Sequence, residues 1–337
     1  MTKLLWFHLH VIFIAAAKAF SATSANVALT NFEQIVSDVP SHGKRIISLT
    51  KQHSDPLLVT SSHAIISPSE CKTLIKYCQS KLQIDFHSGM LCNSCDIKPE
   101  TFEQDLIERN EGAMILKEVQ QMLLETLGLN EWEAVMPRYI YYTDEDCFMD
   151  ETERLLPDGL HVDSNNGKLF RHWTVLLYLT SNPYSGATVF PLIGNNHMDD
   201  DKLSEMQNAI DAAEQLITSG VYHTRMENMT HAQQALAQKV ESYALSSMTH
   251  ERGSTRIVPR EGNLCIFSGI RHDGYPHPAS FHGGESLLKM RMNNMGDTEK
   301  HVLTFFYEVP VGTFSSRVEL GMRVKEREEK FKSVNGI

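Results

Sequence analysis

Two residues of types that bind metal ions lie two positions apart in the segment GLHVDSNN, residues 159–166. In an extended chain the side chains of residues i and i+2 point to the same side, so His161 and Asp163 could face one point. They would supply an imidazole nitrogen and a carboxylate oxygen. Because a His–x–Asp triplet is common by chance, a metal site requires a further ligand from elsewhere in the chain. Two histidines and one carboxylate on one side of an iron ion leave its other positions open for a chelating co-substrate and oxygen.

Histidines that could complete such a site follow in the segment GIRHDGYPHPASFHGGESLLK. His272 and His277 lie in a stretch rich in proline and glycine, which predicts an exposed loop. His282 precedes Gly283 and Gly284 and is placed to begin a strand. Small residues beside it would let a metal ion or a substrate approach the backbone closely. The residues alone leave the choice of the third ligand open.

The chain from Pro137 onward is typical of a β protein. Short segments rich in β-branched and aromatic residues are bounded by Gly, Pro, Asn and Asp, as expected of strands. They are RYIYY (138–142), HWTVLLYLT (172–180), ATVFPL (187–192), NLCIFSG (263–269) and HVLTFFYEV (301–309). This arrangement predicts a sandwich or barrel of several strands.

Helical patterns precede and interrupt these strands. The segment SPSECKTLIKYC (67–78) starts with a capping box, and a second helix is predicted from Glu111 to Leu127. Between residues 195 and 256 apolar residues recur at helical spacing in a polar context, which predicts a helical insertion outside the β core. Residues 311–337 are predicted to form a charged C-terminal helix with a solvated face.

The N-terminus has the pattern of a secretory signal peptide. Lys3 precedes an apolar run from Leu4 to Ala17, and small residues follow this run. The run is shorter than the roughly 20 residues that span a bilayer, which favours a cleaved signal. An uncleaved membrane anchor is the alternative. We therefore predict a signal peptide at residues 1–19, an N-terminal segment at 20–55, and a location in the endoplasmic reticulum, the Golgi lumen or outside the cell.

Charge and cysteine usage are consistent with a lumenal protein. With 31 Lys and Arg residues against 42 Asp and Glu residues, the net charge of −11 disfavours binding to nucleic acid. In an oxidising lumen Cys92 and Cys95 could form a local disulfide. Cys71 and Cys78 lie two helical turns apart, about 10 Å, and are predicted to be core residues. Asn228 opens an Asn-Met-Thr sequon, which predicts a glycan.

The order of six motifs resembles that of the iron(II)/2-oxoglutarate-dependent dioxygenases, in particular the prolyl 4-hydroxylase-like branch. The motifs are DGLHVD, RHWTVLLYLT, SGATVFP, RIVPREGNLCIFSG, DGYPHPASFHGG and KHVLTFFYEV, and together they extend over about residues 56–309. The resemblance implies a mainly β (α+β) domain at residues 56–310, with a double-stranded β-helix (jelly roll) core and supporting N-terminal helices. The helical insertion at 195–256 would interrupt this core, and the terminal helix at 311–337 would follow it.

Carried over onto this sequence, the resemblance selects His282 as the third ligand, so that His161, Asp163 and His282 bind Fe(2+). It also implies that a basic residue at the start of the last core strand binds the distal carboxylate of 2-oxoglutarate. Lys300 matches by its place in that strand. The spacing from His282 to Lys300 is longer than is usual in the family, and Arg291 between them is the alternative.

Further residues follow from the same motifs. A tyrosine that contacts the co-substrate in the family corresponds to Tyr142 or its neighbour Tyr141. Thr188 and Phe190 would line the barrel, and Trp173 is predicted to be a core residue.

The implied activity is hydroxylation of a peptidyl residue, with proline first, in proteins of the secretory pathway. Such a procollagen-proline 4-dioxygenase-like enzyme uses Fe(2+), 2-oxoglutarate, O2 and ascorbate, and its partner is a proline-containing peptide or protein. One alternative is the same chemistry on another residue or on a small molecule. Another is a non-catalytic jelly-roll binding module, which has no need for His161, Asp163, His282 and a basic partner together.

Overall fold

The computed structural model describes residues 47–82, 93–130, 135–143, 161–164, 170–183, 185–194, 198, 200–221, 228–249, 254–285, 299–310 and 312–337. The chain divides into two compact units, Met1–Ile46 and Ile47–Ile337, and every described residue belongs to the second. The predicted signal peptide, Cys92 and Arg291 lie outside the described residues. Among the residues that are described, no helix combines the length and the apolar character needed to span a membrane.

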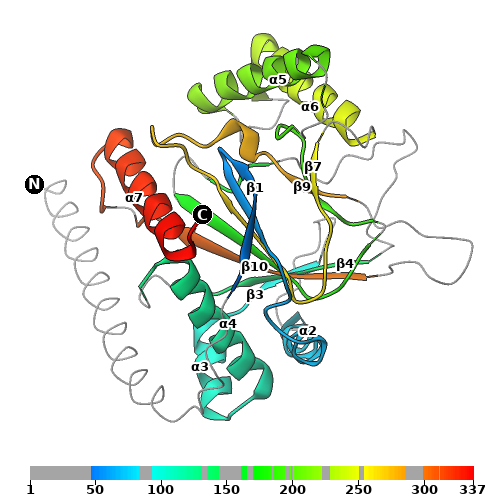
Figure 1. The fold of residues 1–337 in the computed structure, drawn as a ribbon, viewed down its shortest axis with the longest axis vertical. Coiled ribbons are helices and arrows are strands. Elements are labelled where there is room, and N and C mark those ends of the chain that lie inside the picture. Colours follow the sequence, from blue (N-terminus) through cyan, green and yellow to red (C-terminus); the bar gives the residue numbers. More distant parts are fainter. Residues whose placement is uncertain are drawn as a thin grey trace, which may run out of the picture. The chain divides into compact units, whose positions relative to one another are not determined.

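Two antiparallel sheets form the centre of the second unit (Figure 1). The larger sheet has the strand order β1 (Leu49–Ser54), β2 (Leu57–Ser61), β8 (Leu264–Ser268), β5 (Arg171–Tyr178), β10 (Glu299–Glu308), β4 (Arg138–Thr143) and β3 (Asn93–Asp96). The smaller sheet has the order β7 (Thr255–Ile257), β6 (Thr188–Phe190) and β9 (Gly283–Gly284). After β5 the chain passes to β6 and β7, returns to β8, and repeats the exchange from β9 to β10. Strands that alternate between two facing antiparallel sheets form a jelly roll, which confirms the predicted α+β fold class.

The strands at the middle of the large sheet are buried on both faces. All residues of β8 and all but the first of β5 are buried, so these strands carry continuous apolar runs instead of an alternating pattern. Alternate side chains of β5 face opposite ways. Thr174 and Leu176 face the small sheet, whereas Trp173 contacts Phe331 of the C-terminal helix, with ring centroids 4.9 Å apart.

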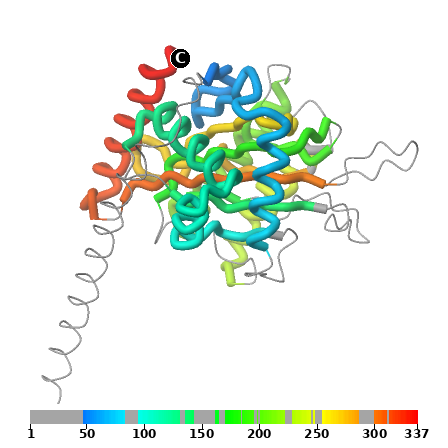
Figure 2. Tube along the Cα trace, turned by 90° about the horizontal axis from the view of Figure 1, so that it is seen from below, coloured from blue at the N-terminus to red at the C-terminus, as the bar shows by residue number. Residues whose placement is uncertain are grey.

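Helices cover the large sheet on the side away from the small sheet (Figures 1 and 2). They are α2 (Pro68–Leu82), α3 (Pro99–Ile107), α4 (Glu111–Leu127) and α7 (Arg317–Asn335). The capping box of α2 forms as predicted, because the Ser67 N–H donates to Glu70 Oε2 at 2.7 Å and the Glu70 N–H donates to Ser67 Oγ at 3.3 Å. Cys71 and Cys78 are buried and not joined to each other, which also agrees with the prediction.

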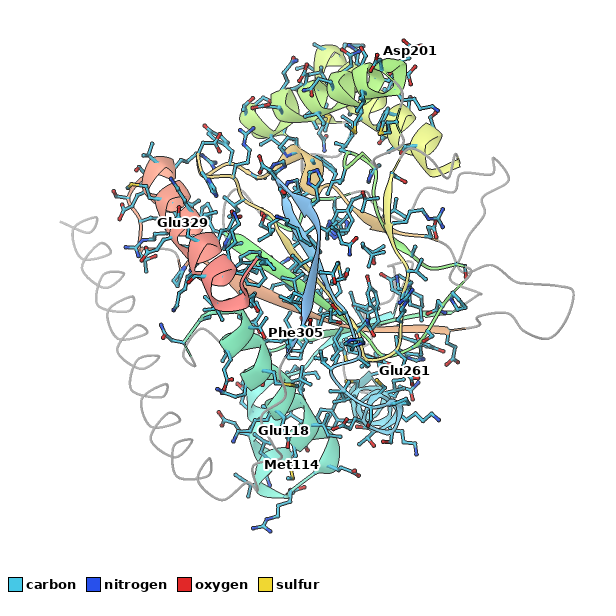
Figure 3. The ribbon with its side chains drawn as sticks, viewed as in Figure 1. Met114, Glu118, Asp201, Glu261, Phe305 and Glu329 are labelled. Carbon is cyan, nitrogen blue, oxygen red and sulfur yellow. The ribbon has the colours of Figure 1, made fainter. Side chains whose placement is uncertain are left out.

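The C-terminal helix is more than a solvated element. Its inner face buries Leu320, Val324 and Phe331. Gly321 lies so close to the loop before the site that a Cβ atom there would be 2.0 Å from the carbonyl oxygen of His272. The prediction of a solvated face is therefore right for the outer residues, such as Glu329 in Figure 3, and wrong for the inner ones.

The predicted insertion contains α5 (Asp200–Thr218) and α6 (His231–Thr249), which lie beyond the small sheet (Figure 1). Figure 3 shows Asp201 at the outer side of α5 and Phe305 of β10 inside the fold. The inner face of α5 belongs to the same apolar cluster as Phe190 and Phe281, through Ala209, Ala212, Ala213, Leu216 and Ile217. Both helices lie outside the two sheets, as expected, and the small side chains of α5 pack directly against the core.

Candidate metal centre

His161, Asp163 and His282 come together at the edge of the small sheet. His161 and His282 form an isolated antiparallel bridge, in which each N–H donates to the other's carbonyl oxygen at 3.1 and 3.0 Å. This pairing puts the two imidazole rings side by side, with centroids 4.5 Å apart. The potential ligand atoms of the two histidines and of Asp163 all lie within 4.8 Å of one another. Across the described residues, this is the one cluster of three or more His, Cys, Asp or Glu side chains that could hold a metal ion.

The hydrogen bonds of this cluster leave acceptor atoms facing each other. His282 Nδ1 lies 3.0 Å from the carbonyl oxygen of Ser280. Since a carbonyl oxygen can only accept, Nδ1 carries the ring proton and Nε2 presents a lone pair. That Nε2 atom lies 3.5 Å from Asp163 Oδ2, and His161 Nε2 lies 3.4 Å from Asp163 Oδ1. A cation between His282 Nε2 and Asp163 would convert this unfavourable contact of two acceptors into coordination.

The protonation states agree with this requirement. Burial lowers the pKa of His282 to about 4, so its imidazole is neutral near neutral pH. Burial acts to raise the pKa of Asp163, but the two histidines and the hydroxyl of Thr174, which donates to Oδ2 at 2.7 Å, hold it below the ordinary range. Neutral imidazole and ionised carboxylate are the forms that bind metal ions.

The donor set fits a divalent transition metal. Two imidazole nitrogens and one carboxylate oxygen on one side leave the remaining positions open, as in non-haem iron(II) oxygenases. Thr174 and Ser280 fix the orientation of two of the ligands through hydrogen bonds, as is usual around protein-bound metals. Ligation of a metal by His161, Asp163 and His282 stays a prediction.

A cavity lined by both sheets opens beside the cluster. Besides the cluster, its walls are formed by Ile140, Tyr142, Leu176, Thr188, Gly283, Gly284, Lys300, Val302, Thr304 and Phe306. Lys300 is only 4 % exposed, and its Nζ atom lies 5.1 Å from the ring centroid of Tyr142 and 6.0 Å from that of Tyr178. A Cβ atom at Gly284 would lie 3.7 Å from Lys300 Nζ and 3.9 Å from Tyr142 Oη, so the glycine borders both groups.

Two of the residues predicted to bind the co-substrate, Lys300 and Tyr142, line this cavity. Lys300, Val302 and Thr304 all line the cavity, and β10 is an inner strand between β5 and β4, so Lys300 is not an edge-strand charge. Of the two candidate tyrosines, Tyr142 lines the cavity, whereas Tyr141 stacks on His301 at the opposite face of β10. Arg291, the alternative to Lys300, lies outside the described residues.

Of the remaining sequence predictions near the site, those for Thr188, Phe190 and Trp173 agree with the structure and that for His277 does not. Thr188 lines the cavity, and Phe190 packs on the ring of His282 with centroids 5.5 Å apart. Trp173 is fully buried. The expected exposure of His277 is wrong: its ring is buried, and its Nδ1 atom accepts from the Ala279 N–H at 3.1 Å at the start of the 3-10 helix Pro278–Ser280.

Sequence reasoning missed Thr174, Ser280 and Glu285. Glu285 follows β9, forms an ion pair with Arg256 of β7 at 2.5 Å, and accepts from the Ala187 N–H at 3.2 Å. Burial raises the pKa of Glu285, while Arg256 and Lys300 act in the opposite direction. A hydroxyl at an inward position of an otherwise apolar strand is the one signal that could have identified Thr174 beforehand.

The chain was compared with protein families, curated proteins and solved structures. No protein-family model matches the chain, and no curated protein matches it. Two crystal structures of the viral collagen prolyl hydroxylase from Paramecium Bursaria Chlorella virus-1 are similar to it. The first, a 2-oxoglutarate complex, is 11% identical, with a TM-score of 0.35 over 75% of this chain and 96% of that chain. The second, a truncated form, is 12% identical, with a TM-score of 0.35 over 81% of this chain and 98% of that chain. At these values the likeness carries no argument about function, which therefore rests on the site itself.

Proposed function

We propose that this protein is an iron(II)- and 2-oxoglutarate-dependent dioxygenase. One observation carries the proposal: the cluster of His161, Asp163 and His282 and the buried ammonium of Lys300 line the same cavity. A 2-oxo acid with two carboxylates matches both features. Its oxo-acid end would chelate the metal, and its distal carboxylate would pair with Lys300 in a charge-assisted hydrogen bond. The negative charge of that carboxylate is complementary to the ammonium of Lys300 in the wall of the cavity.

Different side chains would bind the metal and the co-substrate. Asp163 and the two histidines would hold Fe(2+), which supplies the oxidative chemistry with O2 and 2-oxoglutarate when it is bound. Thr174 and Ser280 keep Asp163 and His282 in orientation. The apolar walls of the cavity exclude water from the reacting groups, through Leu176, Val302 and Phe306.

As substrate we propose a peptidyl residue, with proline first, in proteins of the secretory pathway. The motif resemblance supports this choice and also implies ascorbate as a cofactor. The side chain of His161 is 50% exposed, so the metal end of the cavity is open to a peptide side chain from outside. The N-terminal signal pattern and the exposed sequon at Asn228 support a secretory location. If the N-terminal segment were not cleaved, it would anchor the protein to a membrane.

Succinate formation from 2-oxoglutarate tests the proposal. Purified protein supplied with Fe(2+), ascorbate and 2-oxoglutarate should release succinate, and Asp163→Ala should abolish this release while circular dichroism stays unchanged. Hydroxylation of a peptide library, read by mass spectrometry, then identifies the residue. A protein that binds metal and peptide without any succinate release, at any peptide tested, would instead be a jelly-roll binding module.

A further inference from the structure

The residues on either side of Lys300 face away from the cavity, because successive side chains of a strand alternate. His301 is 2% exposed and lies against two rings of β4. Its ring is stacked on Tyr141, with centroids 4.7 Å apart and planes at 16°, and on Tyr139, with centroids 5.9 Å apart and planes at 22°. The metal cluster uses none of these groups.

A chain of hydrogen bonds connects these residues. Tyr139 Oη lies 2.5 Å from His301 Nδ1, and His301 Nε2 lies 3.0 Å from Glu299 Oε2. Burial raises the pKa of the Tyr139 phenol, so this group stays protonated and donates to Nδ1. The ring proton of His301 is then on Nε2 and points to Glu299. Tyr141 Oη donates to the other oxygen of Glu299 at 3.1 Å, which closes the network.

The backbone around Lys300 has regular strand pairing on one side only. On the β4 side Lys300 pairs with Tyr142, but on the β5 side the pairing begins at Val302. Before Val302, residues beyond the end of β5 supply the bonds. The Leu179 N–H donates to the His301 carbonyl at 2.8 Å, Asn182 Nδ2 donates to the Glu299 carbonyl at 3.1 Å, and the His301 N–H donates to Thr180 Oγ1 at 3.1 Å. The end of a strand with incomplete pairing opens more easily than its middle, so the position of Lys300 depends on these additional contacts.

We propose that Tyr139, His301 and Glu299 are positioning residues, which hold the start of β10 so that Lys300 reaches the co-substrate. The inference rests on the proposed function, because it takes Lys300 as the group that binds 2-oxoglutarate. A lysine side chain is long and flexible, so a fixed backbone is required to bring its ammonium to one place. The metal ligands come from other segments of the chain.

Binding of 2-oxoglutarate by the full-length protein tests the inference, with Mn²⁺ in place of Fe(2+) to prevent turnover. Tyr139→Phe removes the phenol, and Glu299→Leu removes the carboxylate, whereas Glu299→Gln keeps an acceptor for His301. Tyr307→Phe is the matched control, because Tyr307 is a buried tyrosine on the same face of β10 near its other end. Isothermal titration calorimetry measures the dissociation constants of Mn²⁺ and of 2-oxoglutarate in each variant.

Tyr139→Phe and Glu299→Leu should each raise the dissociation constant of 2-oxoglutarate about threefold to tenfold, the range that corresponds to one net hydrogen bond. Glu299→Gln and Tyr307→Phe should bind it like the wild type, and Mn²⁺ affinity should be equal in all variants. In turnover, KM for 2-oxoglutarate should rise while kcat at saturation is kept.

Two results would overturn the inference. If the wild type binds 2-oxoglutarate and both disrupting variants bind it equally well, the network does not position Lys300, and the proposed function still stands. If the wild type does not bind 2-oxoglutarate at all, the proposed function fails and the inference fails with it. Should Tyr139→Phe not fold, the Glu299 pair decides, because the side chain of Glu299 is 50% exposed and its replacement leaves no buried gap.

Discussion

The hydroxyl of Thr174 offers a sharp test of the metal centre, because it acts on one ligand without being a ligand. Thr174 is 2% exposed on β5 and donates to Asp163 Oδ2 at 2.7 Å. Thr174→Val keeps the shape of the side chain and removes this bond. A hydrogen bond to a buried charged group contributes about 1.5–3 kcal/mol, so the carboxylate loses a substantial part of its orientation. Loss of such a contact behind a metal ligand lowers metal affinity about 10-fold to 100-fold.

Titration of the apoprotein with Mn²⁺ or Co²⁺ measures this loss directly. Thermal unfolding gives a second reading, because a metal that binds only the folded state raises the melting temperature by an amount that grows with the logarithm of its affinity. Thr174→Ser retains the hydroxyl and is the control, with an affinity expected near that of the wild type. If Thr174→Val binds the metal as tightly as Thr174→Ser, then Asp163 is not a ligand held by Thr174 and the reasoning about the site is refuted.

Three further substitutions test the core around the site. Burial lowers the pKa of His172 well below its ordinary value of 6.5, so the unfolded chain binds the additional proton, and stability is lost as the pH falls below 6.5. His172→Phe should remove up to about 1.4 kcal/mol of this loss per pH unit, which urea unfolding at several pH values would show, and an unchanged slope would contradict it. Thr304 Oγ1 has no hydrogen-bond partner within the described part of the chain. Thr304→Val should therefore raise the free energy of unfolding by about 1 kcal/mol, and a loss of stability would point to a buried partner such as water. Ile217 of α5 is fully buried in the cluster that includes Phe190. Ile217→Ala should lower the free energy of unfolding by about 3 kcal/mol, and a change near zero would place α5 outside the core.

The strands and the pair of His161 and Asp163 could be predicted because their signals are local. β4, β5, β8 and β10 are dense in β-branched and aromatic residues, and each lies within two residues of its expected bounds. The two-residue spacing of His161 and Asp163 indicates a shared direction wherever the chain is extended. Their approach to His282 was not visible in any local pattern and came from the motif resemblance.

Other elements escaped prediction because their signals depend on the tertiary structure. β1 has the mostly polar sequence LTKQHS and four exposed residues among six, which is typical of an edge strand and hard to distinguish from a loop. The inner face of α5 is rich in alanine, and alanine gives only a weak apolar signal although it allows close packing. The close packing of α7 against the loop at His272 depends on Gly321, because any side chain at this position would collide with that loop. A glycine gives no apolar signal in the sequence.

The register of β10 determines which side chain enters the cavity, and this explains why the long spacing after His282 does not displace Lys300. His301 is paired with Tyr141 of β4, and Val302 is paired with both Ile140 of β4 and Tyr178 of β5. A slip of one residue would turn His301 into the cavity and place the ammonium of Lys300 against the tyrosines on the opposite face. Both outcomes are unfavourable, because the stacked imidazole would lose its hydrogen bonds and the cavity would lose its cation. The length of chain between β9 and β10 can therefore vary without moving Lys300, since its position is set by pairing within the sheet and by the network around His301.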